Sequence, residues 1–121
     1  MPKKILIVDD EPTILKLIAS RLQAHGYETI TASDGQEGLS RARADKPDLI
    51  ILDVMMPKMD GYRVAKMLKL DDLYKGIPII FLTAKVQEQD RETGRLTGAE
   101  AYLTKPCDPE LLISKVTELI G

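Results

Sequence analysis

The sequence predicts an α/β fold, in which a five-stranded parallel sheet in the order 2-1-3-4-5 is doubly wound by five helices. Strand-like and helix-like segments alternate along the 121 residues. Four of the strand-like segments are short apolar runs without polar alternation, which is typical of strands buried on both faces of a parallel sheet. Repeated strand–helix alternation implies a parallel sheet with helices on both faces. In this flavodoxin-like order the switch point lies between the first and third strands.

The first predicted unit runs from a strand at about 4–8 into a helix at about 12–25. Pro12 stands in the first turn of that helix and Gly26 follows its end, which is the usual placement of these two residues. A short strand is predicted next, at about 28–31.

The second unit begins with a helix at about 35–45, for which either Ser33 or Asp34 is a suitable N-terminal cap. Pro47 ends this helix, because the residue before a proline is disfavoured in helical conformation. The apolar run that follows predicts the third strand, at about 48–52.

The remaining units are a helix at about 61–70, a strand at about 79–82 and a final strand–helix pair at about 101–103 and 109–120. The polar segment at about 86–96 has weaker helical patterning, and we predict the fourth helix there.

Composition describes one globular domain spanning residues 1–121. Hydrophobic residues make up 44% of the chain and charged residues of both signs 30%. The net charge of -2 argues against broad binding to nucleic acid or membranes, which favours a basic face. One cysteine, Cys107, permits no internal disulfide, and we find no apolar run of membrane-spanning length and no signal peptide. These features predict a cytoplasmic protein.

Polar and ionisable residues follow four of the predicted strands. Asp9 and Asp10 follow the first strand and Asp53 the third, while Thr83 and Lys105 follow the fourth and fifth. Ligand sites in open α/β sheets lie outside the carboxyl ends of the strands. An isolated aspartate at a strand end is commonly a turn or cap residue. Three carboxylates, a hydroxyl and an ammonium together instead predict a site for a metal ion and a phosphoryl group.

The chemistry of these groups narrows the choice of metal. Clustered carboxylates repel one another until a proton or a cation relieves them. An oxygen-only ligand set suits Mg²⁺, with Mn²⁺ as the alternative, better than zinc, which prefers His or Cys. A carboxylate can also act as a nucleophile and form an aspartyl phosphate. Lys105 is then suited to balance charge, and Thr83 to donate a hydrogen bond to a phosphate oxygen.

The same strand ends carry motifs that resemble the response-regulator receiver domain, the CheY-like module of two-component signalling, over essentially the whole chain. Each motif is short, but the four occur in order at the family's intervals. They are Ile7-Val8-Asp9-Asp10-Glu11, Leu52-Asp53-Val54-Met55-Met56-Pro57 with Asp60-Gly61, Leu82-Thr83-Ala84, and Tyr102-Leu103-Thr104-Lys105-Pro106.

The resemblance implies that Asp53 accepts a phosphoryl group from a phosphohistidine of a sensor histidine kinase or phosphotransfer protein. Asp10 and Asp53 would bind Mg²⁺ directly with the backbone carbonyl of Met55, while Asp9 would act mainly through water. Lys105 would pair with Asp53 or with the phosphoryl group. The protein would be a signalling switch, not an enzyme, and would assist only its own phosphorylation and dephosphorylation.

The resemblance also implies that Thr83 and Tyr102 form the switch. The hydroxyl would move toward the phosphoryl oxygens while the ring turns inward, biasing two arrangements of one surface. That surface comprises the predicted helix at about 86–96 and the elements at about 101–103 and 109–120. It would control a downstream protein or an output domain continuing the chain.

Two positions depart from the family pattern, and one peptide bond is expected to follow it. The Lys105–Pro106 bond should be cis, which an X–Pro bond adopts at low cost. Cys107 stands where the family often has phenylalanine. Glu100-Ala101 keeps one of the paired acids found in receivers that dimerise through this surface to drive DNA-binding domains, which weakens that expectation here.

Two other functions remain open on the residues alone. One is a phosphatase or phosphotransferase that acts on small molecules through an aspartyl phosphate, although such enzymes usually need a cap over the substrate. The other is a flavin-binding module, since flavodoxins share the strand order. Asp9, Asp10 and Glu11 would, however, repel the phosphate of such a cofactor.

Overall fold

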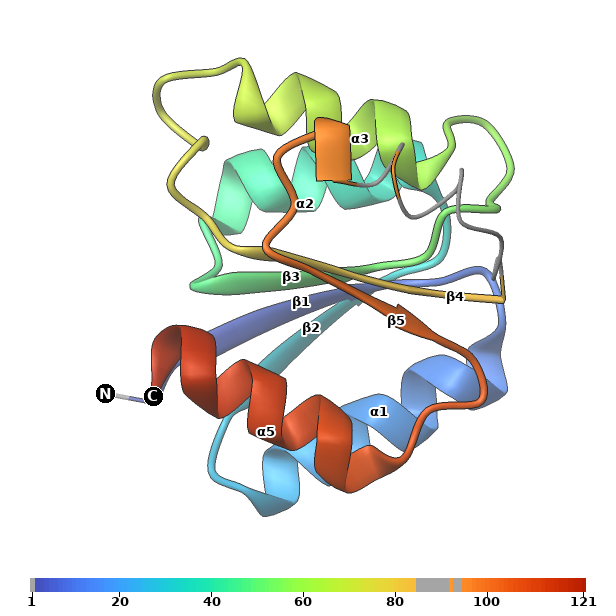
Figure 1. The fold of residues 1–121 in the computed structure, drawn as a ribbon, viewed down its shortest axis with the longest axis vertical. Coiled ribbons are helices and arrows are strands. Elements are labelled where there is room, and N and C mark those ends of the chain that lie inside the picture. The colour runs from blue at the N-terminus through green and yellow to red at the C-terminus, as the bar shows by residue number, and fades with distance from the viewer. Residues whose placement is uncertain (1, 85–91, 93–94) are drawn as a thin grey trace.

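The computed structural model describes residues 2–84, 92 and 95–121 and confirms the predicted sheet (Figure 1). All neighbouring strands are parallel, and their order is β2-β1-β3-β4-β5. The strands are β1 (Lys4–Val8), β2 (Glu28–Ala32), β3 (Leu49–Leu52), β4 (Ile79–Thr83) and β5 (Ala101–Thr104).

Helices cover both faces of the sheet, as the alternation predicted. In Figure 1, α2 and α3 lie on one face, and α1 and α5 lie on the other. Their bounds are α1 (Pro12–Ala24), α2 (Gly35–Asp45), α3 (Gly61–Lys69) and α5 (Pro109–Ile120). The helix predicted at about 86–96 falls largely outside the described residues. Within the described part of the chain, no helix combines the length and the apolar character that a membrane span requires.

The protein has two hydrophobic cores, one on each face of the sheet, and successive residues of a strand contribute to them alternately. In β1, Leu6 and Val8 face the core beneath α2 and α3, whereas Ile5 and Ile7 face the core beneath α1 and α5. Successive side chains of a strand point to opposite faces, so a sheet covered on both sides needs apolar residues at every position. This arrangement explains why the first strand has no polar alternation.

Aspartate side chains cap three of the helices. The Asp34 carboxylate accepts a hydrogen bond of 2.8 Å from the Glu37 amide at the start of α2, and Glu37 in turn accepts one of 2.6 Å from the Ser33 amide. The structure therefore selects Asp34 from the two predicted caps, because this reciprocal pair satisfies two otherwise free amides. The Glu37 amide also lowers the pKa of Asp34. Asp60 and Asp108 cap α3 and α5 with their side chains.

Gly61 brings the start of α3 against the end of β3. Its amide donates a 2.8 Å hydrogen bond to the Val54 carbonyl. A Cβ atom at this position would collide with the backbone carbonyl of Asp53. Glycine is therefore needed here for close approach of two backbone segments. The contact holds the chain that carries Asp53 against the first turn of α3.

Candidate functional site

Backbone hydrogen bonds extend the sheet by one residue and so position the polar side chains beyond it. The Asp53 amide donates to the Val8 carbonyl at 2.9 Å, and the Lys105 amide donates to the Thr83 carbonyl at 2.8 Å. The Asp9 amide bonds in the same way to a carbonyl of β2 at 3.1 Å. Functional side chains on such residues inherit the rigidity of the sheet.

The three predicted carboxylates do lie together. Asp9, Asp10 and Asp53 each offer one oxygen, and these oxygens lie within 4.8 Å of one another. The side chains differ in exposure, because Asp9 and Asp53 are buried and Asp10 is exposed. The cluster thus combines two buried carboxylates with one exposed carboxylate.

Lys105 reaches into this cluster from the end of β5. Its ammonium donates to Asp9 at 2.6 Å and to Asp53 at 3.4 Å, and it lies 3.8 Å from the exposed carboxylate of Glu11. The shortest contact is therefore with Asp9, whereas the resemblance implied pairing with Asp53. Burial lowers the pKa of Lys105, but the hydrogen bond to Asp9 and the charge of Asp53 outweigh it and raise that pKa overall. The ammonium thus stays charged.

Asp53 has an unfavourable electrostatic environment. Burial raises its pKa and the neighbouring Asp9 carboxylate raises it further. The charge of Lys105 and a hydrogen bond from the Thr83 hydroxyl act in the opposite direction without cancelling the rise. One ammonium among three carboxylates leaves net negative charge, which a divalent cation would relieve. The donor set therefore fits a hard cation with oxygen ligands.

A cavity of about 460 Å³ opens beside the exposed member of the cluster. Asp10, Met55, Pro57 and Tyr62 are among the residues that line it. Met55, whose backbone carbonyl was predicted as a metal ligand, therefore lines the same cavity as Asp10. The Met55 side chain is 63% exposed.

The two predicted switch residues occupy adjacent strands. Thr83 is buried at the end of β4, and its side chain lowers the pKa of Asp53. Tyr102 is half-buried on β5, where its ring lies 5.9 Å from the ring of Phe81, its register partner on β4. Its hydroxyl oxygen lies 3.4 Å from that of Tyr62, a residue we did not predict. The sequence signal for Tyr62 is its place directly after the Asp60-Gly61 motif.

The segment after β5 holds two further predicted features. The Lys105–Pro106 peptide bond is cis, as expected. Cys107 is half-buried against the core beneath α1 and α5, and burial together with the Asp108 carboxylate raises the pKa of its thiol. The thiol is thus protonated at neutral pH and acts here as a small side chain in the core.

A doubly wound sheet with an acidic cluster and a lysine at its switch point defines a flavodoxin-like α/β domain with a candidate metal site. The model of the response regulator receiver domain matches residues 5–117. The chain belongs to that family, whose members are signalling switches of two-component systems and generally not enzymes.

Individual relatives agree with this assignment. The alkaline phosphatase synthesis transcriptional regulatory protein PhoP of Bacillus subtilis is 48% identical over 120 residues, which are 99% of this chain and 49% of PhoP. PilH of Pseudomonas aeruginosa is 38% identical over 118 residues, or 98% of each protein. The chain thus spans about half the length of PhoP and nearly all of PilH.

Solved structures show the same fold. The chemotaxis protein CheY4 of Vibrio cholerae superimposes with a TM-score of 0.92 at 36% sequence identity, covering 98% of this chain and 99% of that one. The similarity extends over the whole sheet and not only over the motifs at its carboxyl edge.

Proposed function

We propose that Asp53 accepts a phosphoryl group from a phosphohistidine of a sensor histidine kinase or phosphotransfer protein, in a reaction that depends on Mg²⁺. The observation that carries this proposal is the approach of the Asp9, Asp10 and Asp53 oxygens within 4.8 Å, with the Lys105 ammonium among them. The matching family supports the assignment of roles.

The transfer step needs no proton to be removed from the nucleophile. An ionised Asp53 oxygen forms the bond to phosphorus as the bond from phosphorus to the imidazole nitrogen breaks. The electron pair of the broken bond stays on that nitrogen, and the donor leaves as a neutral imidazole because its other ring nitrogen carries a proton when the bond breaks. Phosphoryl transfer of this kind depends mainly on positioning and charge neutralisation.

The acidic cluster supplies the ligands for the metal. Asp10, Asp53 and the backbone carbonyl of Met55 would hold Mg²⁺ directly, and Asp9 would act through water. When bound, the ion supplies positive charge that lowers the repulsion between the carboxylates and an incoming phosphate. Lys105 then moves from neutralising Asp9 and Asp53 to balancing the phosphoryl oxygens, which its flexible stem permits.

The response follows from Thr83 and Tyr102. The Thr83 hydroxyl would donate a hydrogen bond to a phosphoryl oxygen on Asp53, and the Tyr102 side chain on β5 would turn inward in response. The surface affected comprises β5, α5 and the predicted helix at about 86–96. It would control a downstream protein or an output domain, while the domain itself spans residues 1–121 and binds neither nucleic acid nor membranes.

The test is incubation of the protein with Mg²⁺ and acetyl phosphate, followed by intact-mass measurement. We expect a gain of one phosphoryl group that disappears in Asp53→Asn and when the metal is chelated. Asp72→Asn is the matched control, because Asp72 is an exposed aspartate outside the site, and it should gain phosphate like the wild type. Phosphate retained by Asp53→Asn would disprove the assignment. Turnover of phosphomonoesters would instead support a small-molecule phosphatase.

A further inference from the structure

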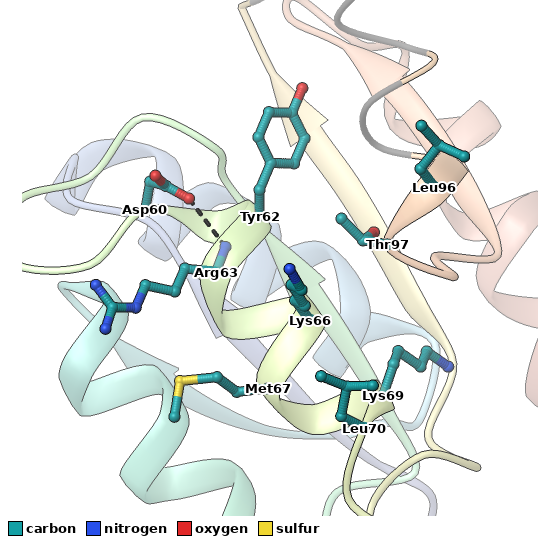
Figure 2. Close-up of a pocket in the computed structure, with 9 residues that line it drawn as sticks. All are labelled: Asp60, Tyr62, Arg63, Lys66, Met67, Lys69, Leu70, Leu96 and Thr97. Carbon is teal, nitrogen blue, oxygen red and sulfur yellow. Dashed lines mark hydrogen bonds between the residues drawn. The ribbon is translucent and has the colours of Figure 1, made fainter.

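Tyr62 borders two cavities and belongs to neither the acidic cluster nor the predicted switch pair. It lies in the first turn of α3, one residue after Gly61. It lines the 460 Å³ cavity that contains Asp10, and it also lines a cavity of about 810 Å³ along α3. Figure 2 shows Tyr62 at one end of this second cavity, with Lys69 and Leu70 at the other.

An aromatic cluster joins Tyr62 to Tyr102. The rings of Tyr62 and Phe81 lie 5.2 Å apart, edge to face at 77°, and those of Phe81 and Tyr102 lie 5.9 Å apart. Both distances are in the range of favourable aromatic pairs. The two tyrosine hydroxyl oxygens approach to 3.4 Å, at the long end of hydrogen-bonding distance. Phe81 is fully buried in β4, so the cluster has a rigid base.

We propose that Tyr62 is a positioning residue for the switch, whose hydroxyl holds Tyr102 in the orientation that accompanies the contact between Thr83 and Asp53. This inference rests on the proposed function. In the structure the two arrangements occur together: Tyr102 lies against Tyr62 on one side of β4, and buried Thr83 stands at the end of β4, where it lowers the pKa of Asp53. A contact present in one arrangement of a two-state switch favours that arrangement by its own interaction energy. Loss of the Tyr62 hydroxyl should therefore favour the other arrangement.

The position of Tyr62 in α3 makes this role distinct from that of Tyr102. Gly61 holds the first turn of α3 against the backbone of Asp53, so Tyr62 is carried by the same rigid unit as the phosphoacceptor. Tyr102 is carried by β5, two strands away from β3. The hydroxyl pair thus connects the element that holds Asp53 with the edge strand of the sheet.

The experiment compares the wild type with Tyr62→Phe by titration with beryllofluoride, a phosphoryl mimic, in Mg²⁺. Tyr62→Phe keeps the edge-to-face ring and removes only the hydroxyl, so the fold should be retained. We expect the beryllofluoride concentration at half-saturation to rise about threefold, as the loss of one weak hydrogen bond predicts. Tyr74→Phe is the matched control, because its hydroxyl bonds to the Arg43 carbonyl at 3.5 Å, away from Tyr102. It should titrate like the wild type.

A double-mutant cycle and a spectroscopic signal separate positioning from a general loss of stability. In a Tyr102→Phe background, Tyr62→Phe should change beryllofluoride binding less than it does in the wild type, because the Tyr102 hydroxyl is already absent. With 3-fluorotyrosine incorporated, the ¹⁹F resonance of Tyr102 should shift in Tyr62→Phe before beryllofluoride is added and should not shift in Tyr74→Phe.

The outcomes distinguish this inference from the proposed function. A wild-type protein that neither gains phosphate nor responds to beryllofluoride overturns both. A wild-type protein that responds, with Tyr62→Phe binding equally well and with an unshifted Tyr102 resonance, overturns only the role of Tyr62. Additive effects of Tyr62→Phe and Tyr102→Phe would also contradict it.

Discussion

At the scale of single residues, the balance of charge around Asp53 determines what the site can bind. Burial and the Asp9 carboxylate both disfavour the ionised form of Asp53, and its pKa is raised in spite of Lys105 and Thr83. Yet a nucleophile must be ionised to attack phosphorus. The site therefore tolerates an unfavourable carboxylate in the absence of metal, a form of local destabilisation common at functional sites.

The raised pKa of Asp53 predicts how its replacement changes stability with pH. Between the unfolded pKa and the raised folded pKa, the folded state binds more protons than the unfolded state, so stability falls as pH rises through this window. The Asp53→Asn variant lacks this titrating carboxyl and therefore does not lose folding stability in this pH window. In chelator at pH 7 we expect its melting temperature to exceed that of the wild type by a few degrees, since about 1 kcal/mol corresponds to roughly 4 °C for a domain of this size. Thermal unfolding followed by circular dichroism measures the difference.

Two controls define this experiment. The difference should disappear near pH 3, below the ordinary aspartate pKa of about 3.9, because both states are then protonated. Added Mg²⁺ should stabilise the wild type more than the variant, since binding to the folded state adds stability by mass action. An Asp53→Asn protein that melts below the wild type at pH 7 in chelator would show that Asp53 stabilises the fold.

At the scale of elements, the contact between α3 and the end of β3 sets the position of Asp53. The Gly61 amide bonds to the Val54 carbonyl, and there is no room for a Cβ atom beside the Asp53 carbonyl. The Asp60 side chain caps the same turn of α3 by accepting a hydrogen bond from the Arg63 amide at 2.9 Å (Figure 2). Capping and close approach therefore act on one turn, and both depend on local backbone geometry.

This contact predicts that Gly61→Ala displaces the phosphoacceptor. Relief of the collision must move either α3 or the loop after β3, and overpacking of this kind costs about 1–3 kcal/mol. We expect a lower midpoint in urea unfolding and slower phosphorylation by acetyl phosphate. Gly76→Ala is the matched control, because nothing lies within 4 Å of a Cβ atom there. If Gly61→Ala left both measurements at the wild-type values, the backbone at Asp53 would be less constrained than the structure indicates.

At the scale of the whole molecule, the site exists because parallel strands bring their carboxyl ends to one edge. Lys105 and Asp9 are separated by 96 positions along the chain, yet their side chains meet at 2.6 Å. The same sheet connects the site with its edge strand, because Thr83 and Tyr102 lie on the neighbouring strands β4 and β5. Tyr102 pairs with Phe81, two residues before Thr83. Packed strands of this kind transmit discrete rearrangements better than gradual ones.

The route across the sheet predicts where phosphorylation is detected. Beryllofluoride in Mg²⁺ should shift the amide resonances of β5 and α5 in a ¹⁵N–¹H spectrum, in addition to those beside Asp53. The residues of β2, at the opposite edge of the sheet, should shift less. Asp53→Asn should show none of these changes. Shifts confined to the loops that contain Asp10 and Met55 would contradict transmission to β5.

Much of this architecture follows from the sequence because it depends on local properties. Apolar runs predicted β1, β3, β4 and β5, whereas β2 was predicted from a more polar segment. The proline and glycine residues around α1 predicted its ends within one residue. The acidic cluster was predictable as well, since topology alone brings Asp9, Asp10 and Asp53 to the switch point. The choice of Asp34 over Ser33 as cap was not, because both residues can accept a hydrogen bond and only the actual backbone angles decide between them.

The sequence by itself determined the fold class, the strand order and the set of groups in the site, because periodicity and strand ends are properties of neighbouring residues. Only the tertiary structure decided which groups touch. It placed Lys105 closer to Asp9 than to Asp53 and brought Tyr62 to Tyr102 across Phe81. Such contacts depend on the relative position of elements to within about 1 Å, and that position results from how two whole cores pack and not from any short segment.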